Sequence, residues 1–293
     1  MKRTYPPPEI VTEMCTGCGL CAEVCPSFVL DMVGTKALVV RGEWCIGCGH
    51  CGAVCPVEAV VHETIADERA PRPGRRPATT ADTLLMLLRE RRSVRLYRNE
   101  PISDEILEQI IEAGRYAPTG SNSQNVHYVI LRSSSEIASL RNMTMAFYEK
   151  VFSRVRKPIG ALLLSLLAGR RIVEYLRELL PKVEYVKGLI EEGKDPLFYN
   201  APVVMVVHAE SWDTCSAFNC AVAIYNCSLM AHTMGVGCCF NGYLMSAANN
   251  DRKIKQWLGI PRDHRCFGAM TLGYQEVEFQ RLVERTPAKV SWR

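Results

Sequence analysis

The chain has 293 residues, of which 48% are hydrophobic, so it is long enough for two domains and can bury a substantial core. Its formal net charge of +4 is too small to indicate nucleic-acid binding, and lysine and arginine form no dense stripe outside one short stretch. The longest apolar run, residues 159–169, is too short to cross a bilayer, and residues 1–8 lack the apolar run of a signal peptide. We therefore expect a cytoplasmic protein with no transmembrane segment and no nucleic-acid partner.

Two copies of one cysteine pattern lie near the start of the chain, over residues 15–26 and 45–56. Each copy has three cysteines separated by two residues, then a fourth cysteine after three more residues, followed by proline. This is the bacterial run that holds two [4Fe–4S] clusters, with the fourth cysteine of each run on the other cluster. The predicted ligands are Cys15, Cys18, Cys21 and Cys55 for one cluster, and Cys45, Cys48, Cys51 and Cys25 for the other.

Zinc sites and disulfides are the alternatives for these cysteines. Zinc sites usually pair two short knuckles across a longer gap, and disulfides need an oxidising compartment, so we prefer the clusters. The runs resemble those of the bacterial two-cluster ferredoxins over about residues 1–66. This part has four Lys/Arg against seven Asp/Glu, whereas the remainder is basic. The asymmetry favours docking of the two parts on each other, or docking of an external basic electron donor.

The next segment, residues 67–82, is rich in proline and arginine and predicts an extended linker. Residues 83–293 then form a second domain, in which apolar, β-rich segments are separated by long helical stretches rather than by hairpins. This order indicates an α+β domain with a central mixed sheet flanked by helices, and residues 142–200 form a helical insertion. Helices are expected at 84–91, 104–115, 142–190 and 215–234, and strands at 126–131, 202–207, 235–240 and 270–274.

A short basic segment, Arg91-Arg92-Ser93-Val94-Arg95, follows the first of these helices. Arginine pairs with phosphate bidentately and serine adds a hydrogen bond, so the segment suits a phosphate group, although a solvated helix end is the plainer alternative. A polar loop at residues 117–128 feeds the first strand and is rich in amides and hydroxyls. Such groups suit the polar edge of a flavin ring; the alternative is an ordinary loop.

Together with a helix carrying Asn226 before Gly235-Val236-Gly237, and with Arg285-Thr286-Pro287, these segments resemble the nitroreductase family of FMN enzymes over about residues 83–293. The resemblance implies a homodimer with FMN at the interface. It assigns the phosphate to Arg91, Arg92, Ser93, Arg95 and Arg285, the flavin to Pro118, Thr119, Gly120 and Asn122, and flavin N5 to the backbone amides of Asn241 and Gly242. Two departures stand out: Asn125-Val126 replaces the family's frequent Pro-Trp, and residues 142–200 have no match.

The two parts together predict an FMN-dependent oxidoreductase. A low-potential donor such as ferredoxin would send electrons through both clusters to FMN, which would reduce an organic acceptor by hydride transfer. Nitroaromatics, quinones, flavins and activated alkenes are the candidate acceptors. No side chain is assigned a catalytic role, because the chemistry is at N5 and solvent can supply the proton. The alternative is an electron-transfer or redox-sensing protein with no small-molecule substrate of its own.

Three further features carry weaker expectations. The apolar run 159–169 has cationic flanks and suits a buried lid or dimer helix, with peripheral membrane contact as the alternative. The six cysteines outside the runs are expected to be buried thiols, although Cys238 or Cys239 could instead face the flavin. The six histidines are scattered, and we assign no acid–base role to any of them.

Overall fold

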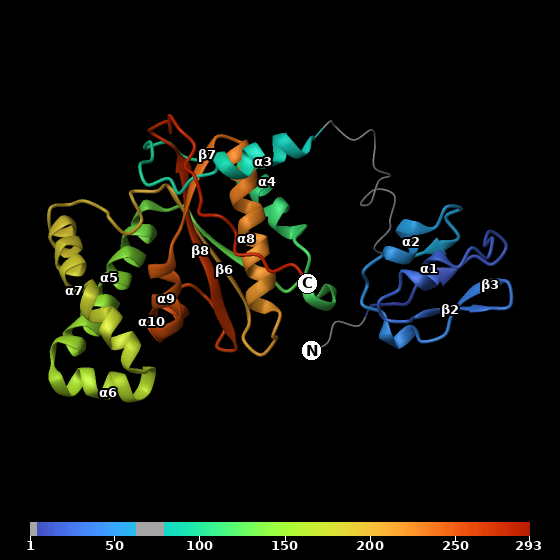
Figure 1. Ribbon diagram of the computed structural model, residues 1–293, viewed down its shortest axis with the longest axis horizontal. Coiled ribbons are helices and arrows are strands. Elements are labelled where there is room, and N and C mark those ends of the chain that lie inside the picture. The colour runs from blue at the N-terminus through green and yellow to red at the C-terminus, as the bar shows by residue number, and fades with distance from the viewer. Residues whose placement is uncertain (1–4, 63–78) are drawn as a thin grey trace. The chain divides into compact units, whose positions relative to one another are not determined.

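The computed structural model describes residues 5–62 and 79–293. The chain divides into two compact units, each described by itself (Figure 1). The first unit comprises the described residues up to Thr79 together with the turn Thr119–Gln124, and the second comprises Thr80–Pro118 and Asn125–Arg293. Most of the predicted linker 67–82 lies outside the described residues, and its last two residues already belong to a helix.

The first unit is built from short elements around a small core. Its elements are β1 (Glu9–Ile10), α1 (Leu20–Glu23), β2 (Leu30–Val33), β3 (Lys36–Val39), a 3-10 turn η1 (Gly42–Trp44), α2 (His50–Val54) and β4 (Val60–Val61). β1 pairs antiparallel with β4, and β2 with β3. The buried core is Val29, Leu30, Ala37 and Val60 with Cys21 and Cys51. Cysteines are therefore part of the core itself, as expected for a domain too small to build a large apolar interior.

A four-stranded sheet is the centre of the second unit. Its strands are β5 (His127–Leu131), β6 (Val203–Glu210), β7 (Val236–Phe240) and β8 (His264–Tyr274), in the order β5-β6-β8-β7. All three pairings are antiparallel, and an isolated parallel bridge joins Ser93, outside the strands, to Cys238 on β7. The α+β fold class predicted from the sequence is confirmed.

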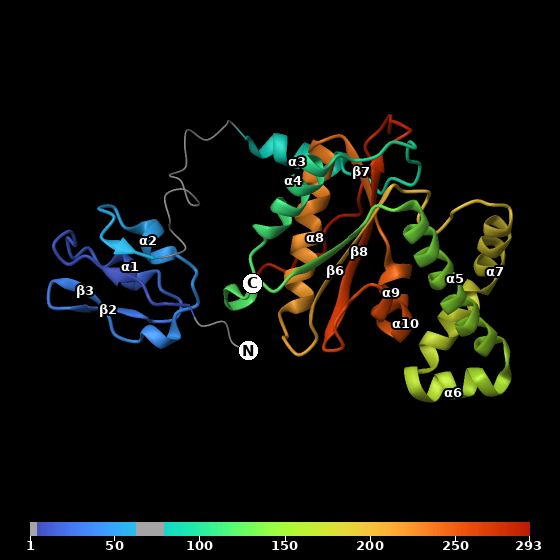
Figure 2. The same cartoon turned by 180° about the vertical axis from the view of Figure 1, so that it is seen from behind.

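Helices cover both faces of this sheet, as Figure 1 and the reverse view in Figure 2 show. α4 (Asp104–Arg115) and α8 (Ser216–Thr233) pack on one face, against Val203 and Met205 of β6. α5 (Ser134–Arg156), α9 (Gly242–Asn250) and α10 (Arg252–Trp257) pack on the other, against Val204 and Val206. Because alternate residues of a strand face opposite sides, β6 must be apolar on both faces, which explains its unbroken apolar sequence.

Several boundaries differ from the expected ones, for local reasons. α3 (Ala81–Glu90) begins earlier than predicted, because the Thr80 hydroxyl caps it by accepting a hydrogen bond from Thr83 N. β8 begins six residues before the predicted 270, since its partner β6 continues to Glu210 and pairs that residue with His264. His264 and Arg265 are polar, unlike the apolar residues that indicate a buried strand. The strand expected from the sequence therefore lacked this extension.

The helical insertion consists of three helices instead of one long stretch: α5, α6 (Pro158–Ala168) and α7 (Arg170–Glu191). Lys157 is extended because the residue before a proline is disfavoured in the helical region, and Gly169 ends α6 with φ 93°. Ile159 and Leu166 are each 75% exposed, so the apolar run is not a lid buried within one chain, and the expected dimer helix stays a prediction. No helix in residues 5–62 and 79–293 has the length and apolarity needed to span a membrane.

Two helical glycines predict opposite effects of the same substitution. A Cβ on Gly114 in α4 would lie 2.6 Å from both Cys227 Sγ and the Tyr128 hydroxyl, whereas one on Gly188 in α7 would meet nothing within 4 Å. We expect Gly114→Ala to destabilise the second unit by about 1–3 kcal/mol through overpacking, and Gly188→Ala to stabilise it by roughly 0.5–1 kcal/mol through helix propensity. Thermal unfolding of both variants measures this, and a stabilised Gly114→Ala protein would contradict the close α4–α8 packing.

Candidate functional site

The cysteines of the first unit gather around two small cavities. One cavity is lined by Cys15, Cys18, Cys21 and Cys55. The other is lined by Cys25, Cys45, Cys48 and Cys51. Each cavity thus takes three cysteines from one run and the fourth from the other, which is the crossed grouping that the sequence pattern predicts. Left-handed glycines make the tight turns between the cysteines: Gly17 has φ 72°, and a Cβ there would lie 2.1 Å from the carbonyl oxygen of Thr35.

Backbone amides donate to the sulfurs of the fourth cysteines in a repeated way. Val29 N donates to Cys25 Sγ at 3.3 Å, and Ala59 N donates to Cys55 Sγ at 3.2 Å. Burial, more than the neighbouring thiols, raises the pKa of Cys51 to about 11. A bound metal is the kind of charge that holds such a sulfur as a thiolate at neutral pH. The donor set and its amide hydrogen bonds therefore fit iron–sulfur clusters.

His62 adds one side chain to the second of these sites. Its ring is buried, with Nε2 3.7 Å from Cys45 Sγ. A metal-bound thiolate can only accept, so a histidine facing it must donate its N–H. No sequence pattern points to this residue, because His62 stands outside both cysteine runs.

In the second unit, the predicted phosphate-binding segment extends along the edge of β7. Ser93 bridges to Cys238, and Val94 N donates to Cys238 O at 2.9 Å. Gly237 permits this approach, since a Cβ there would lie 2.7 Å from the Val94 side chain. Tyr97 fixes the end of the segment with a buried hydroxyl that donates to Val94 O and lies 2.9 Å from Thr271 Oγ1. The short sequence Arg91–Arg95 is therefore held against the sheet and not left as a solvated helix end.

Two of the arginines carry buried nitrogens that lack a protein partner within the described chain. These atoms are Nε and Nη1 of Arg91 and Nε of Arg92. Both residues line a cavity of about 470 Å³, together with Cys238, Gln275 and Arg281. Burial raises the pKa of the Cys238 thiol to about 11 against the opposing effect of Arg91. This thiol is therefore neutral at pH 7 and is not a negative partner for Arg91. Buried guanidinium nitrogens without a protein hydrogen-bond partner fit an anion that has several acceptor oxygens, such as a phosphate.

The other predicted phosphate residues lie differently. Arg95 does not line this cavity; its guanidinium lies 5.9 Å from the ring centre of Tyr199. Arg285 is exposed in the C-terminal segment and does not line the cavity, whereas Arg281, four residues earlier, does. Sequence reasoning missed Arg281, because only the family's Arg-x-Pro pattern pointed into this tail.

The residues predicted at the flavin ring divide between the units. Pro118 belongs to the second unit, whereas Thr119, Gly120 and Asn122 belong to the first. Within the first unit, Asn122 Nδ2 donates to the carbonyl oxygens of Ile46 and Gly47, each at 3.0 Å. Asn122 has φ 52° and its neighbour Ser121 has φ 51°, a backbone strain that is typical of functional loops.

Asn241 and Gly242 lie at the start of α9, directly after β7. Asn241 N already donates to Ala269 O at 2.8 Å, and the Asn241 side chain caps α9 by accepting from Leu244 N. Of the two backbone amides predicted to face N5, that of Gly242 is the one the described contacts leave open to a ligand. A Cβ on Gly242 would meet nothing within 4 Å, so the space beside this residue is free.

Family models match both parts of the chain. Residues 88–274 match the nitroreductase family, and residues 9–59 match the 4Fe-4S dicluster domain. A protein of Archaeoglobus fulgidus named as a candidate NADH dehydrogenase/NAD(P)H nitroreductase is 25% identical over 194 residues, which are 66% of this chain and 86% of that protein. The chain therefore belongs to the nitroreductase family, and it is an oxidoreductase of that family that carries a 4Fe–4S dicluster domain at its N-terminal side.

Solved structures share the fold of the second unit. A nitroreductase with bound FMN from Bacteroides fragilis NCTC 9343 superposes with a TM-score of 0.50 at 23% identity, covering 73% of this chain and 100% of that one. A nitroreductase with bound FMN from Desulfitobacterium hafniense DCB-2 gives a TM-score of 0.50 at 21% identity, covering 71% and 97%. At these identities the likeness establishes the fold.

The His62 geometry predicts a shift in reduction potential. A hydrogen bond to a cluster sulfur favours the reduced, more negative state, so His62→Phe is expected to make the potential of one cluster more negative. His50 lies in the second cysteine run and lines the same cavity, but it is exposed and no described contact joins its ring to a cysteine sulfur, so His50→Phe is the control. A redox titration followed by electron paramagnetic resonance measures both clusters. Equal potentials in wild type and His62→Phe would contradict an N–H donated by His62 to sulfur.

Proposed function

We propose that this protein is an iron–sulfur flavoprotein that takes electrons from a low-potential donor through two [4Fe–4S] clusters to FMN, which reduces an organic acceptor by hydride transfer. The observation that carries the proposal is the pair of four-cysteine cavities in a chain whose other unit has the nitroreductase fold. Nicotinamide delivers hydride directly and needs no clusters, so this combination favours a one-electron donor such as ferredoxin. Nitroaromatics, quinones, flavins and activated alkenes remain the acceptor classes.

The chain's own residues have separate tasks in this proposal. The cysteines lining each cavity hold one cluster as thiolates, and the amides of Val29 and Ala59 donate to two of these sulfurs. Arg91 and Arg92 bind the FMN phosphate with the guanidinium nitrogens that lack a protein partner within the described residues. Gly242 N offers a hydrogen bond at the flavin, and no side chain is required as a catalytic acid. FMN bound between two copies of the chain, as the family resemblance implies, completes the proposal.

The role of Arg91 predicts a loss of flavin affinity. Charge-assisted hydrogen bonds contribute about 1.5–3 kcal/mol each, so Arg91→Gln is expected to weaken FMN binding roughly 10- to 100-fold. Arg252→Gln removes an exposed arginine on α10 and is expected to leave FMN binding unchanged. Flavin retained on ultrafiltration at stepped protein concentrations measures both affinities. Unchanged FMN binding by Arg91→Gln would place the phosphate elsewhere.

The relay predicts that turnover depends on the cysteine runs only when a one-electron donor is used. With reduced ferredoxin as donor, the paired variant Cys18→Ser and Cys48→Ser is expected to lose most steady-state reduction of a nitroaromatic or quinone. Cys215→Ser, which changes a half-buried cysteine outside the runs, is expected to retain it. Iron and FMN contents of each variant are measured alongside turnover.

An anaerobic absorbance titration distinguishes the cluster-to-FMN relay from direct reduction by a pyridine nucleotide and from an electron-transfer protein without a substrate. Flavin bleaching by reduced ferredoxin but not by NADH or NADPH supports the relay. Full bleaching by a pyridine nucleotide, with ferredoxin turnover untouched in the paired cysteine variant, would contradict it. Flavin reduction by ferredoxin without turnover of any acceptor would instead favour the electron-transfer protein that we consider the alternative.

A further inference from the structure

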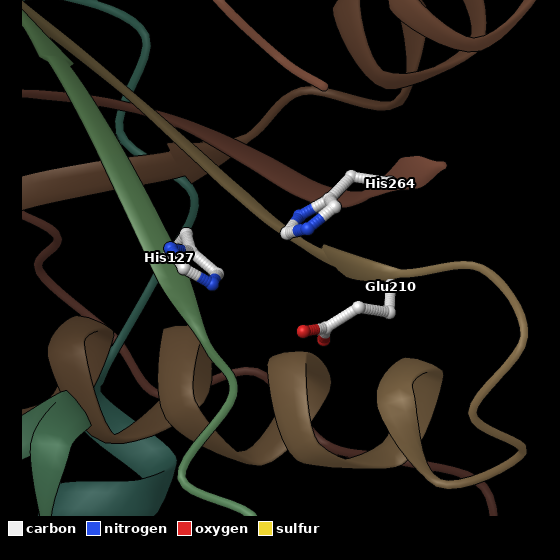
Figure 3. A group of neighbouring side chains, drawn as sticks. All are labelled: His127, Glu210 and His264. Atoms are coloured by element: carbon white, nitrogen blue, oxygen red, sulfur yellow. The ribbon is translucent and has the colours of Figure 1, made fainter. Parts of the chain in front are cut away.

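Three strands of the second unit bring titratable side chains together at one end of the sheet. The antiparallel register sets His127 of β5 opposite His208 of β6, and Glu210 of β6 opposite His264 of β8. Figure 3 shows the side chains of His127, Glu210 and His264 pointing toward one another from these strands. The three residues are far apart in the sequence and carry no motif, so only the pairing of the strands unites them.

The spacing of this group suits a metal ion. One nitrogen of each imidazole and one carboxylate oxygen of Glu210 all lie within 4.8 Å of one another. Ligand atoms around a single tetrahedral zinc ion, each about 2.1 Å from the metal, lie roughly 3.4 Å apart. Small side-chain movements therefore convert the observed group into a coordination sphere.

Glu210 on β6 and His264 on β8 each have a hydrogen-bond partner of the kind that commonly orients a metal ligand. Glu210 Oε2 accepts from Asn125 Nδ2 at 3.0 Å, and Asn125 Oδ1 accepts from the fully buried Asn219 at 3.0 Å. His264 Nδ1 lies 2.9 Å from Nδ1 of His208, and both rings are more than nine-tenths buried. Such second partners orient ligating side chains, and here they leave the other oxygen of Glu210 and the other nitrogen of His264 for a cation.

The surrounding charges also favour a cation. Asp213 Oδ2 lies 3.0 Å from the same Asn125 nitrogen that binds Glu210, so two carboxylates converge on one amide. Lys255 of α10 is a basic side chain on this side of the unit, and its ammonium group donates to the backbone carbonyls of Arg262 and His264. Three imidazoles with ring centres 5.0–5.2 Å apart and a glutamate are the donor set that zinc and similar divalent transition metals prefer.

We propose that His127, Glu210 and His264 bind one divalent transition-metal cation of the zinc class, with His208 as the partner of His264. Three protein ligands leave at least one coordination position for water or another small ligand. The site stands at the His264 end of β8, whereas the cavity lined by Arg91 includes Gln275 just beyond the other end of that strand. At about 3.3 Å per residue the two lie roughly 30 Å apart, so the cation is separate from the flavin phosphate. A bound ion would tie together the ends of β5, β6 and β8.

Zinc binding to the full-length protein, purified anaerobically with its cofactors, tests this site. After equilibrium dialysis against Zn²⁺, mass spectrometry measures zinc and iron in the same sample, so zinc in empty cysteine sites is recognised by a deficit of iron. We expect one zinc per chain at full iron content. His127→Gln and Glu210→Gln are expected to bind zinc at least tenfold more weakly, and His127 is exposed, so that change spares the core. His232→Gln, at the far end of α8, is the matched control and is expected to bind as wild type does.

A stability measurement gives a second readout that does not depend on activity. Zinc is expected to raise the unfolding temperature of wild type and of His232→Gln, but not that of His127→Gln. Asn125→Ala, which removes the partner of Glu210 together with the contacts of Asn125 to Asp213 and Asn219, is expected to weaken zinc binding about 10-fold. Wild-type protein that binds no zinc at full iron content, or His127→Gln and Glu210→Gln proteins that bind as tightly as wild type, would overturn the proposal.

Discussion

The pairing of β8 with strands on both of its edges is the constraint on which the second unit depends. β8 runs for eleven residues between β6 and β7, and its two ends serve different sites. Near Tyr274 it holds the segment that leads away from Arg91 and Arg92, since Arg98 N donates to Tyr274 O. At His264 it contributes to the proposed cation site. The pairing of this one strand, with a register shift opposite Val207 and His208, therefore fixes two separate groups of side chains.

The first unit depends on a different interaction, the convergence of cysteines from two runs on two cavities. A unit this small buries little apolar surface, and cysteines occupy part of its core. The crossing of the fourth cysteines ties each run to the other, so cluster binding and folding are expected to be coupled as they are for other structural metal sites. The second unit instead carries buried guanidinium nitrogens of Arg91 and Arg92 that have no hydrogen-bond partner among the residues the structure describes.

Much of the fold could be predicted, because the signals were local. Ser103 accepts from Ile106 N and begins α4 where the sequence pattern placed it, whereas the stretch expected as one helix over 142–190 is divided at Pro158 and Gly169. Differences came from distant partners: β6 lengthened β8 beyond its apolar part, and the folded chain left Leu162, Leu163 and Leu166 of α6 exposed. In the candidate site, the cysteines line two cavities in the crossed grouping and nitrogens of Arg91 and Arg92 are buried, while their binding of clusters and phosphate stays a prediction. No sequence pattern indicates that Arg281 lines the cavity and Arg285 does not, or that the Asn241 amide donates to Ala269 O.

The sequence by itself determined the class of chemistry, because spacing along the chain is enough to specify it. Three cysteines spaced two residues apart can wrap a cluster, and a short run of arginines with a serine suits a phosphate group, wherever these segments lie in the fold. Tertiary structure alone decided which arginine of the C-terminal segment reaches the cavity and that His62 faces Cys45. It also brought His127, Glu210 and His264 together. The physical reason is strand register: hydrogen bonds between distant segments set which residues become neighbours, and no local preference of the chain encodes that choice.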